Sequence, residues 1–399
     1  MNMTLCRSSK ARDLGRIRPL LAALALLVLA VTARAKAVLP DEDIPNDFVH
    51  LTIADGLSQG SAFSILQDRK GFIWIGTEDG LNRYDGRVFK IYRSTAAPNS
   101  LSNNTGRILF EDSQGVLWIG TLSGLNRYNR ETDDFTRYLS DPDDPNSLSH
   151  NAIYAICEDQ AGTLWLGTEG GGVNSFDRKT GKFTRYLRNG NSKETAVKQK
   201  IIYSLHVDKQ DVLWIATYGG LHALDLKTGK MTVYVHDPQN ALSLSSDQVR
   251  VIFEDRKGTL WLGTDGGGLN ALDRTTGKFT RYLHNYKNPR SLSHNTIYAI
   301  YQDLSGNLWI ATNEGLNRYD EEKNDFTVIR NDPRNRASLS YDYVVSIFED
   351  RSGVLWIGTR GRGIDQYVRD RTKFGLYVHR PDDPNSLGSS YIRGIAEDA

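Results

Sequence analysis

Cysteine is almost absent from this chain of 399 residues, which contains Cys6, Cys157 and no others. Cys6 lies in an amino-terminal segment that we expect to be removed, so Cys157 would be left alone and no intrachain disulfide could form. In the repeat described below, Cys157 aligns with apolar residues, namely Leu66, Phe110 and Phe253. We therefore predict that Cys157 is a buried packing residue and not a reactive thiol.

An excess of charge of one sign is also absent, because 49 basic residues stand against 48 acidic ones. Residues 1–37 hold seven of the basic residues and one acidic residue, which leaves 42 basic and 47 acidic residues, a net charge of −5, in the rest of the chain. Such a domain has no basic field to attract nucleic acid or an anionic membrane surface. We therefore expect no nucleic-acid partner.

The apolar run from Leu20 to Val31 is shorter than the ~20 residues that span a bilayer. Basic residues precede this run, and the small-residue sequences Ala33-Arg34-Ala35 and Ala35-Lys36-Ala37 follow it. This arrangement predicts a secretory signal peptide over residues 1–37, a linker over residues 38–47 and a periplasmic location. An uncleaved membrane anchor is the alternative.

The sequence offers little support for catalysis. The eight His residues occur singly, without metal-ligand spacing. Glu-Asp pairs such as Glu111-Asp112 recur with the repeat, which indicates a structural turn and not a general acid and base. The chain has no phosphate-binding loop. We therefore predict no catalytic residue, no metal site and no cofactor.

What the chain does contain is one phrase, close to D-x-x-G-x-x-W-x-G-T, copied seven times. All seven tryptophans fall in it, at intervals of 44 to 49 residues: Trp74, Trp118, Trp165, Trp214, Trp261, Trp309 and Trp356. An Asp precedes each Trp by six residues: Asp68, Asp112, Asp159, Asp208, Asp255, Asp303 and Asp350. A period of this length with short apolar segments is typical of a β-propeller, whose blades have about four strands each.

The fifth unit shows how one repeat becomes one blade. Turn residues divide it into four expected strands, at Val251–Glu254, Leu260–Gly263, Leu269–Leu272 and Phe279–Tyr282. The alternation of apolar and polar residues in these segments is typical of half-buried antiparallel strands. We predict an all-β fold, a seven-bladed β-propeller of four-stranded antiparallel blades.

The conserved residues of the phrase have structural explanations. The Asp carboxylate can accept backbone N–H groups two and three residues further on, and the Gly supplies a positive φ, so D-x-x-G closes a hairpin. The fourth unit has Asp211 in place of the Gly. The Trp would pack between neighbouring sheets, and the Gly or Ala two residues later would allow close approach. A sugar-binding role for the Trp rings is the alternative.

The segment ILFEDSQGVLWIGTLSGLNRYN, from Ile108 to Asn129, resembles the two-component regulator propeller repeat, and the match extends sevenfold over residues 48–399. The resemblance implies the periplasmic sensor region of a hybrid histidine kinase or a diguanylate cyclase. In that family, paired seven-bladed propellers usually precede a β-sandwich, a membrane span and the output module. None of these follows in this chain, so we expect an amino-terminal portion of such a sensor, with membrane-linked kinase or cyclase modules as its partners.

The two ends of the array supply spare strands. Residues 48–52 resemble a fourth strand ahead of the first unit, and residues 391–399 resemble the truncated first strand of an eighth repeat. The seven full repeats then cover residues 48–390. Closing seven blades needs only one spare strand, so we predict a ring that is either closed by overlap of its termini or left imperfect.

One face of the propeller varies between repeats, and loops that vary on a constant scaffold usually carry recognition. Its turns contribute Tyr218 and Arg360, among others. One strand position, five residues before each repeat Asp, is aromatic or cationic in most units: Phe63, Arg107, Tyr154, Tyr203, Arg250, Tyr298, Val345 and Arg393. If the first strand lines the central channel, these residues surround its mouth. We predict a ligand site made of Arg107, Tyr154, Tyr203, Arg250, Tyr298, Tyr218 and Arg360. Ordinary packing between blades is the alternative.

These observations favour an exported, non-enzymatic sensor that binds a small periplasmic ligand, such as an oligosaccharide. A propeller-fold polysaccharide lyase or glycoside hydrolase is the second hypothesis. It needs unique acidic or His groups in the channel, which the sequence does not display. A protein-interaction scaffold is the third hypothesis.

Overall fold

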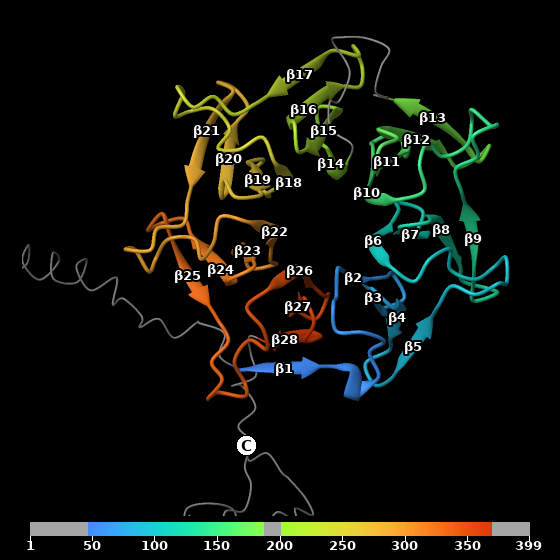
Figure 1. Cartoon of the computed structure of the whole chain (residues 1–399), viewed down its shortest axis with the longest axis horizontal. Coiled ribbons are helices and arrows are strands. Elements are labelled where there is room, and N and C mark those ends of the chain that lie inside the picture. The colour runs from blue at the N-terminus through green and yellow to red at the C-terminus, as the bar shows by residue number, and fades with distance from the viewer. Residues whose placement is uncertain (1–46, 187–200, 369–399) are drawn as a thin grey trace, which may run out of the picture. The chain divides into compact units, whose positions relative to one another are not determined.

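The computed structural model of the chain describes residues 47–186 and 201–368. They form seven antiparallel sheets of four strands each, arranged in chain order around a central axis (Figure 1). The predicted all-β, seven-bladed propeller is therefore confirmed. The expected signal peptide, most of the linker, the strand at 391–399 and Arg393 lie outside the described residues.

Blades one to six each consist of four strands that are consecutive in sequence, numbered from the inner to the outer edge. Their bounds are, for blade one, β2 Ser64–Gln67, β3 Ile73–Thr77, β4 Gly80–Tyr84 and β5 Phe89–Tyr92; for blade two, β6 Gly106–Glu111, β7 Leu117–Thr121, β8 Gly124–Asn129 and β9 Asp134–Tyr138; for blade three, β10 Ile153–Glu158, β11 Leu164–Thr168, β12 Val173–Asp177 and β13 Lys182–Tyr186; for blade four, β14 Ile202–Val207, β15 Val212–Thr217, β16 Gly220–Asp225 and β17 Met231–Tyr234; for blade five, β18 Val249–Glu254, β19 Leu260–Thr264, β20 Leu269–Asp273 and β21 Lys278–Tyr282; and for blade six, β22 Ile297–Gln302, β23 Leu308–Thr312, β24 Gly315–Asp320 and β25 Asp325–Ile329.

The seventh blade closes the ring. Its inner strands are β26 (Val344–Glu349), β27 (Val354–Thr359) and β28 (Ile364–Val368), and its outer strand is β1 (Phe48–Leu51) from the other end of the chain. In Figure 1 the blue β1 lies beside the red β28. The sequence left open whether the ring is closed by its termini or imperfect. The ring is closed, and the residues near 48–52 supply the closing strand. A short 3-10 turn, Ile53–Asp55, then leads into blade one.

His50 strengthens this closure. It lies opposite Asp365 in the β1–β28 ladder, and its Nδ1 is 2.6 Å from an Asp365 carboxylate oxygen. Asp365 is fully buried and also accepts hydrogen bonds from the backbone N–H and hydroxyl of Ser340. Five other blades have an Asn at this repeat position. The hydrogen bond to Asp365 raises the pKa of His50, against a smaller opposing effect of burial.

The D-x-x-G turns differ in one respect from their predicted geometry. In the first blade, one Asp68 carboxylate oxygen accepts the N–H groups of Lys70 and Phe72, two and four residues further on, and not three. The N–H of Gly71 bonds instead to the backbone carbonyl of Asp68. Gly71 has a φ of 98°, and Asp211, which replaces this Gly in the fourth unit, has a φ of 62°. Both therefore adopt the left-handed conformation that the turn requires.

The other oxygen of each repeat Asp binds the repeat Trp, which the sequence analysis did not foresee. In all seven described blades the indole Nε1 donates to the carboxylate Oδ2 at 2.5 to 2.9 Å. The strict spacing of six residues follows from this bond, because it joins the ring on the second strand to the turn that precedes that strand. The polar edge of each Trp is thus satisfied while its ring is buried.

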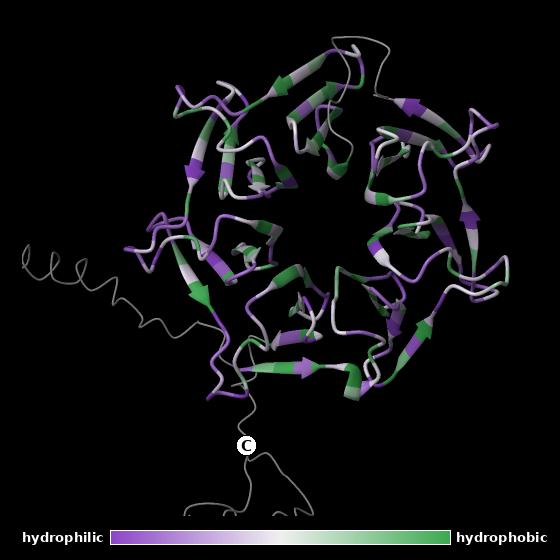
Figure 2. Cartoon of the chain, viewed as in Figure 1, coloured by the Kyte–Doolittle hydropathy of each residue, from purple (hydrophilic) through white to green (hydrophobic). Residues whose placement is uncertain are grey.

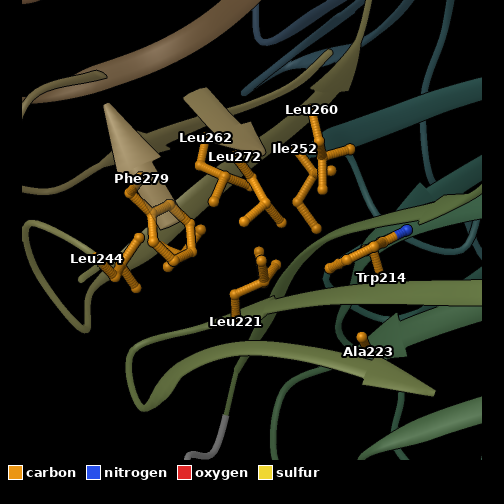
Figure 3. Packing of buried hydrophobic residues seen from close by; sticks show 11 residues of the cluster. Trp214, Leu221, Ala223, Leu244, Ile252, Leu260, Leu262, Leu272 and Phe279 are labelled. Atoms are coloured by element: carbon orange, nitrogen blue, oxygen red, sulfur yellow. The ribbon is translucent and has the colours of Figure 1, made fainter. Parts of the chain in front are cut away.

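The core consists of repeated clusters between neighbouring blades. Figure 3 shows one of them, in which Trp214 and Leu221 of blade four face Ile252, Leu272 and Phe279 of blade five. Trp214 is 4% exposed. Burying a Trp side chain removes about 200 Å² from water, which stabilises the fold by about 5 kcal/mol before entropy is considered. The predicted packing of the Trp between sheets is confirmed.

The Gly or Ala two residues after each Trp allows the inner strand of the next blade to pack closely against the second strand. A Cβ atom on Gly263 would lie 2.6 Å from Cγ2 of Ile297 in blade six. Figure 2 shows hydrophilic residues in the rim loops and on outer strands such as β9, β13 and β21, while the second strand of every blade is almost wholly buried. Cys157 is buried as predicted, and its burial raises the pKa of its thiol. Among the described residues, no helix is long and apolar enough to cross a membrane.

Candidate functional site

A central cavity of about 540 Å³ opens among the inner strands. The residues that line it are Phe63, Glu78, Thr105, Arg107, Ile108, Leu122, Tyr154, Tyr203, Arg250, Tyr298, Val345 and Arg360. All seven described members of the strand position singled out in the sequence are on this list. Glu78, Leu122 and Arg360 belong to turns between second and third strands, so the cavity opens on the face whose turns vary between repeats.

A β-bulge places these side chains. In blade three, Ile153 faces Thr168 and Ala155 faces Gly167, so Tyr154 is an extra residue in the inner strand. The same irregularity occurs in six blades, and the extra residues are Arg107, Tyr154, Tyr203, Arg250, Tyr298 and Val345. A bulge redirects a side chain out of the regular alternation of the strand. The inner strands can therefore keep their alternate residues in the core and still present one residue each to the cavity.

Arg250 is held by a built-in counter-ion. Its Nη1 lies 3.0 Å from Oδ2 of Asp265 and 2.9 Å from the hydroxyl of Tyr218, which itself donates to Asp265 at 2.7 Å. Tyr218 stacks on Tyr203, with centroids 4.4 Å apart. Tyr218 is not among the residues that line the cavity, and it lies behind two of them, Arg250 and Tyr203, which it contacts. Burial raises the pKa of Asp265, but the hydrogen bond from Tyr218 and the charge of Arg250 outweigh it, so the pKa is lowered.

Arg107 has different surroundings. Its guanidinium lies between two rings, 5.0 Å from the centroid of Phe63 and 4.9 Å from that of Tyr154. Tyr154 in turn donates a hydrogen bond to Glu169 at 3.3 Å. Burial and the charges of Arg250 and Arg360 lower the pKa of Arg107, against the opposing effect of Tyr154. Two aromatic faces thus stabilise a half-buried cation by cation–π interaction.

The seventh blade contributes through a residue that the sequence analysis missed. Val345 occupies the strand position there and lines the cavity, while Tyr343 is not among the lining residues and packs against Tyr298, with ring centroids 4.9 Å apart. The Tyr343 hydroxyl donates to that of Tyr298 at 2.6 Å and accepts from Nη1 of Arg360 at 2.9 Å. The sequence did carry a signal for this residue. Val345 is aliphatic at a position that is aromatic or cationic in the other units, and Tyr343 lies two residues before it.

A second hollow, of about 670 Å³, lies between blades four and five near the D-x-x-G turns. Ala223 lines it, at the repeat position where three other units have the Arg of G-L-N-R-Y. Part of its charged wall is already paired, since Arg274 lies 3.2 Å from Asp208 and 3.0 Å from Glu254. These contacts explain this hollow as part of the joint between blades, so the central cavity is the better candidate for a ligand.

The Arg274 contacts belong to a repeated clamp, which the sequence analysis also missed. An Arg that follows the third strand of one blade bonds the repeat Asp of the preceding blade and a Glu of its own inner strand. The three such groups are Arg130 with Asp68 and Glu111, Arg178 with Asp112 and Glu158, and Arg274 with Asp208 and Glu254. The clamp gives each repeat Asp concerned a third role, in addition to closing its turn and binding its Trp.

The cavity wall contains one carboxylate, Glu78, and no His. No group of His, Cys, Asp and Glu in the described part of the chain is arranged to hold a metal ion. What the wall offers is guanidinium donors, tyrosine hydroxyls and aromatic rings. This chemistry suits the binding of a polar molecule with anionic or ring-shaped parts.

Comparison with known proteins agrees with the fold and the repeat. A model of the two component regulator propeller matches residues 56–79, 100–123, 147–170, 243–266, 291–314 and 338–361. Six of the seven repeat units therefore match the two component regulator propeller repeat. The unit around Trp214 is not matched by that model, yet it forms a blade of the same kind with the same Asp–Trp bond.

The chain resembles sensor proteins in particular. It is 32% identical to the extracellular domain of a hybrid two component system of B. thetaiotaomicron, with a TM-score of 0.70, over 81% of this chain and 42% of that one. The extracellular domain of a one component system of the same organism has the same fold, at 24% identity and a TM-score of 0.64, over 81% of this chain and 40% of that one.

A curated relative matches a short stretch. Over 47 residues, 12% of this chain and 3% of the relative, the chain is 55% identical to histidine kinase P4 of Formosa agariphila. The chain thus spans less than half the length of each of these three relatives. The domain resembles the extracellular sensor domains of hybrid two component systems.

Proposed function

We propose that this chain is the exported, ligand-sensing input region of a two component or diguanylate cyclase signalling protein. A small periplasmic ligand, such as an oligosaccharide, binds in the central cavity, and the bound state biases membrane-linked output modules. The chain itself does no catalysis. The observation that carries the proposal is the row of bulges in six blades, which directs one side chain from each of their inner strands into a single cavity.

The size and chemistry of the cavity support binding. A volume of about 540 Å³ falls within the range of small-molecule sites. Most of its aromatic and arginine residues, namely Arg107, Tyr154, Tyr203, Arg250 and Tyr298, lie on inner strands and not on long loops, so little order has to be gained on binding. The similarity to extracellular sensor domains supports the assignment to signalling.

Ligand-dependent stabilisation tests the proposal. Thermal unfolding of the full chain is measured with a panel of plant and microbial oligosaccharides. A ligand at 100 times its Kd should add about 2.7 kcal/mol to the free energy of unfolding. Tyr203→Ala and Arg250→Ala should abolish the effect. Tyr286→Ala is the matched control, since Tyr286 is 92% exposed. Equal affinity in the cavity variants and the wild type would refute the site.

The enzyme hypothesis has less support. Most glycoside hydrolases use a pair of carboxyl groups, and the described wall of the cavity has Glu78 alone. A turnover assay on the same glycans separates binding from catalysis. A stable protein partner in co-purification, without any small-molecule effect, would favour the scaffold hypothesis.

A further inference from the structure

Arg107 and Arg250 occupy the same bulge position in the second and fifth blades, but they differ in their partners. Arg250 has an ion pair with Asp265 and a hydrogen bond with Tyr218. Arg107 has neither a hydrogen bond nor an ion pair to any residue within 47–186 and 201–368; it contacts the rings of Phe63 and Tyr154. One of the two cations is therefore neutralised by the protein and the other is not.

The difference arises from the turn that follows the second strand. Blade five has Asp265 directly after Thr264, whereas blade two has Leu122 directly after Thr121. Leu122 lines the cavity, so an apolar side chain stands where blade five places its carboxylate. The absence of a counter-ion for Arg107 is thus built into the local sequence.

The nearby carboxylates do not supply the missing partner. Glu78 is on the cavity wall and accepts a hydrogen bond from the Gln59 side chain at 3.3 Å. Glu169 accepts the Tyr154 hydroxyl, and Asp265 is engaged with Arg250. None of the three has an oxygen within salt-bridge distance of the Arg107 guanidinium in the part of the chain that the structure describes.

The free donors of Arg107 point to a particular ligand group. The guanidinium donates through N–H groups that lie in one plane and match the two oxygens of a carboxylate. Two flanking rings restrict its movement, so little side-chain entropy is lost when an anion binds. A cation that is half-buried and unpaired gains more from an anion than one in open water, because screening is weaker.

We propose that Arg107 is the anion-binding residue of this cavity and that its ligand is a small polar molecule bearing a carboxylate, held through two parallel hydrogen bonds. This inference rests on the proposed function, namely that the cavity binds a ligand. The cavity volume of about 540 Å³ suits a molecule of one or two rings. The carboxylate can belong to an acidic sugar or to an amino acid or short peptide.

Calorimetric titration and thermal unfolding of the full chain test this proposal. The probes are galacturonate and digalacturonate, alanine and dialanine, and the neutral sugar galactose. We expect a carboxylate probe to bind, with an affinity that falls as salt is raised. Arg107→Met should weaken that binding at least tenfold, because a charge-assisted pair is lost. Arg107→Lys should restore part of it, since Lys keeps the charge but not the bidentate geometry.

Stability measurements separate binding from folding. Without a probe, Arg107→Met should unfold at the same temperature as the wild type or slightly higher, since it removes an unpaired charge. Arg334→Met is the control, because Arg334 is 91% exposed and has its only described partner, Asp332, on the surface. Whichever carboxylate probe binds, sugar or peptide, identifies the source of the ligand.

Two results would overturn the assignment. If galactose binds as tightly as galacturonate and Arg107→Met binds both like the wild type, the carboxylate assignment is wrong while ligand binding in the cavity stands. If no probe, and no oligosaccharide of the panel above, stabilises the wild type, both the ligand site and the role of Arg107 are wrong.

Discussion

Replacing Arg178 by Met should weaken the joint between blades two and three. Arg178 lies 2.6 Å from the Asp112 carboxylate in blade two and 2.9 Å from Glu158 in blade three. Met has a similar length and no charge, so the substitution removes both ion pairs with little change in packing. Because Asp112 is fully buried, its carboxylate cannot recover the lost partner from water.

The magnitude follows from what remains around Asp112. Removing one partner of a buried ion pair costs about 3–5 kcal/mol. Three other donors stay in place, namely the Trp118 indole and the backbone N–H groups of Gln114 and Val116. Arg178 is also 15% exposed, so part of its attraction is screened. We therefore expect a loss of about 2 kcal/mol in the free energy of unfolding.

Urea unfolding followed by tryptophan fluorescence measures this loss. Lys179→Met is the matched control, because Lys179 lies in the same turn and its side chain is exposed. A double-mutant cycle with Glu158→Gln should give a coupling of about 1 kcal/mol. If Arg178→Met and Lys179→Met unfold at the same urea concentration, the clamp does not stabilise the ring and the reasoning is wrong.

The pH dependence supplies a second check on the same residue. Burial raises the pKa of Asp112, but its hydrogen bonds to Trp118, Val116 and Arg178 outweigh this and leave the pKa below its ordinary value. A lowered folded pKa means that the stabilisation is present above the unfolded pKa of about 4 and is lost as pH falls through the folded pKa. The difference between the wild type and Arg178→Met should therefore shrink below pH 4.

Three further predictions concern the ring as a whole. The folded pKa of His50 is raised, so its contribution to the stability of the closed ring is complete below pH 6.5 and is lost as pH rises through the folded pKa. Asp365→Asn should remove this pH dependence when the free energy of unfolding is compared at pH 6 and pH 9. An unchanged difference between the two pH values would contradict this prediction. Gly263→Ala should cost about 1–3 kcal/mol in urea unfolding, because its Cβ would collide with Ile297, and an unaltered midpoint would show that the blades can separate at no cost. In a Cys6→Ser background, Cys157 should react with a thiol reagent at pH 8 only after denaturant is added, because burial raises its pKa.

The strands were predictable because each is a short alternating segment between turn residues. The expected strand Leu260–Gly263 is Leu260–Thr264 in the structure, and Phe279–Tyr282 is Lys278–Tyr282. The closing strand at residues 48–51 was one of two candidates, and the choice depended on a pairing with β28 across almost the whole chain. Pairing over such a distance leaves no local pattern in the sequence.

The candidate site was predictable in position and not in detail. A strand position that is aromatic or cationic in most repeats indicated the cavity lining, and the structure brings all its described members together. The placement of Tyr218 behind the wall depends on a hydrogen bond to Asp265, a residue 47 positions away. The clamp of Arg178 and the role of Tyr343 likewise depend on neighbouring blades, which the pattern of a single repeat does not specify.

The bulge in the inner strands has a consequence for how such a repeat array can change. The residue at the bulge is outside the regular hydrogen-bonded register, so its identity places few demands on the strand around it. Arg, Tyr and Val all occur at this bulge within the described part of the chain, above cores that are built alike. The side chains that line the cavity can therefore change one blade at a time, by single substitutions at positions that lie outside the buried clusters between blades.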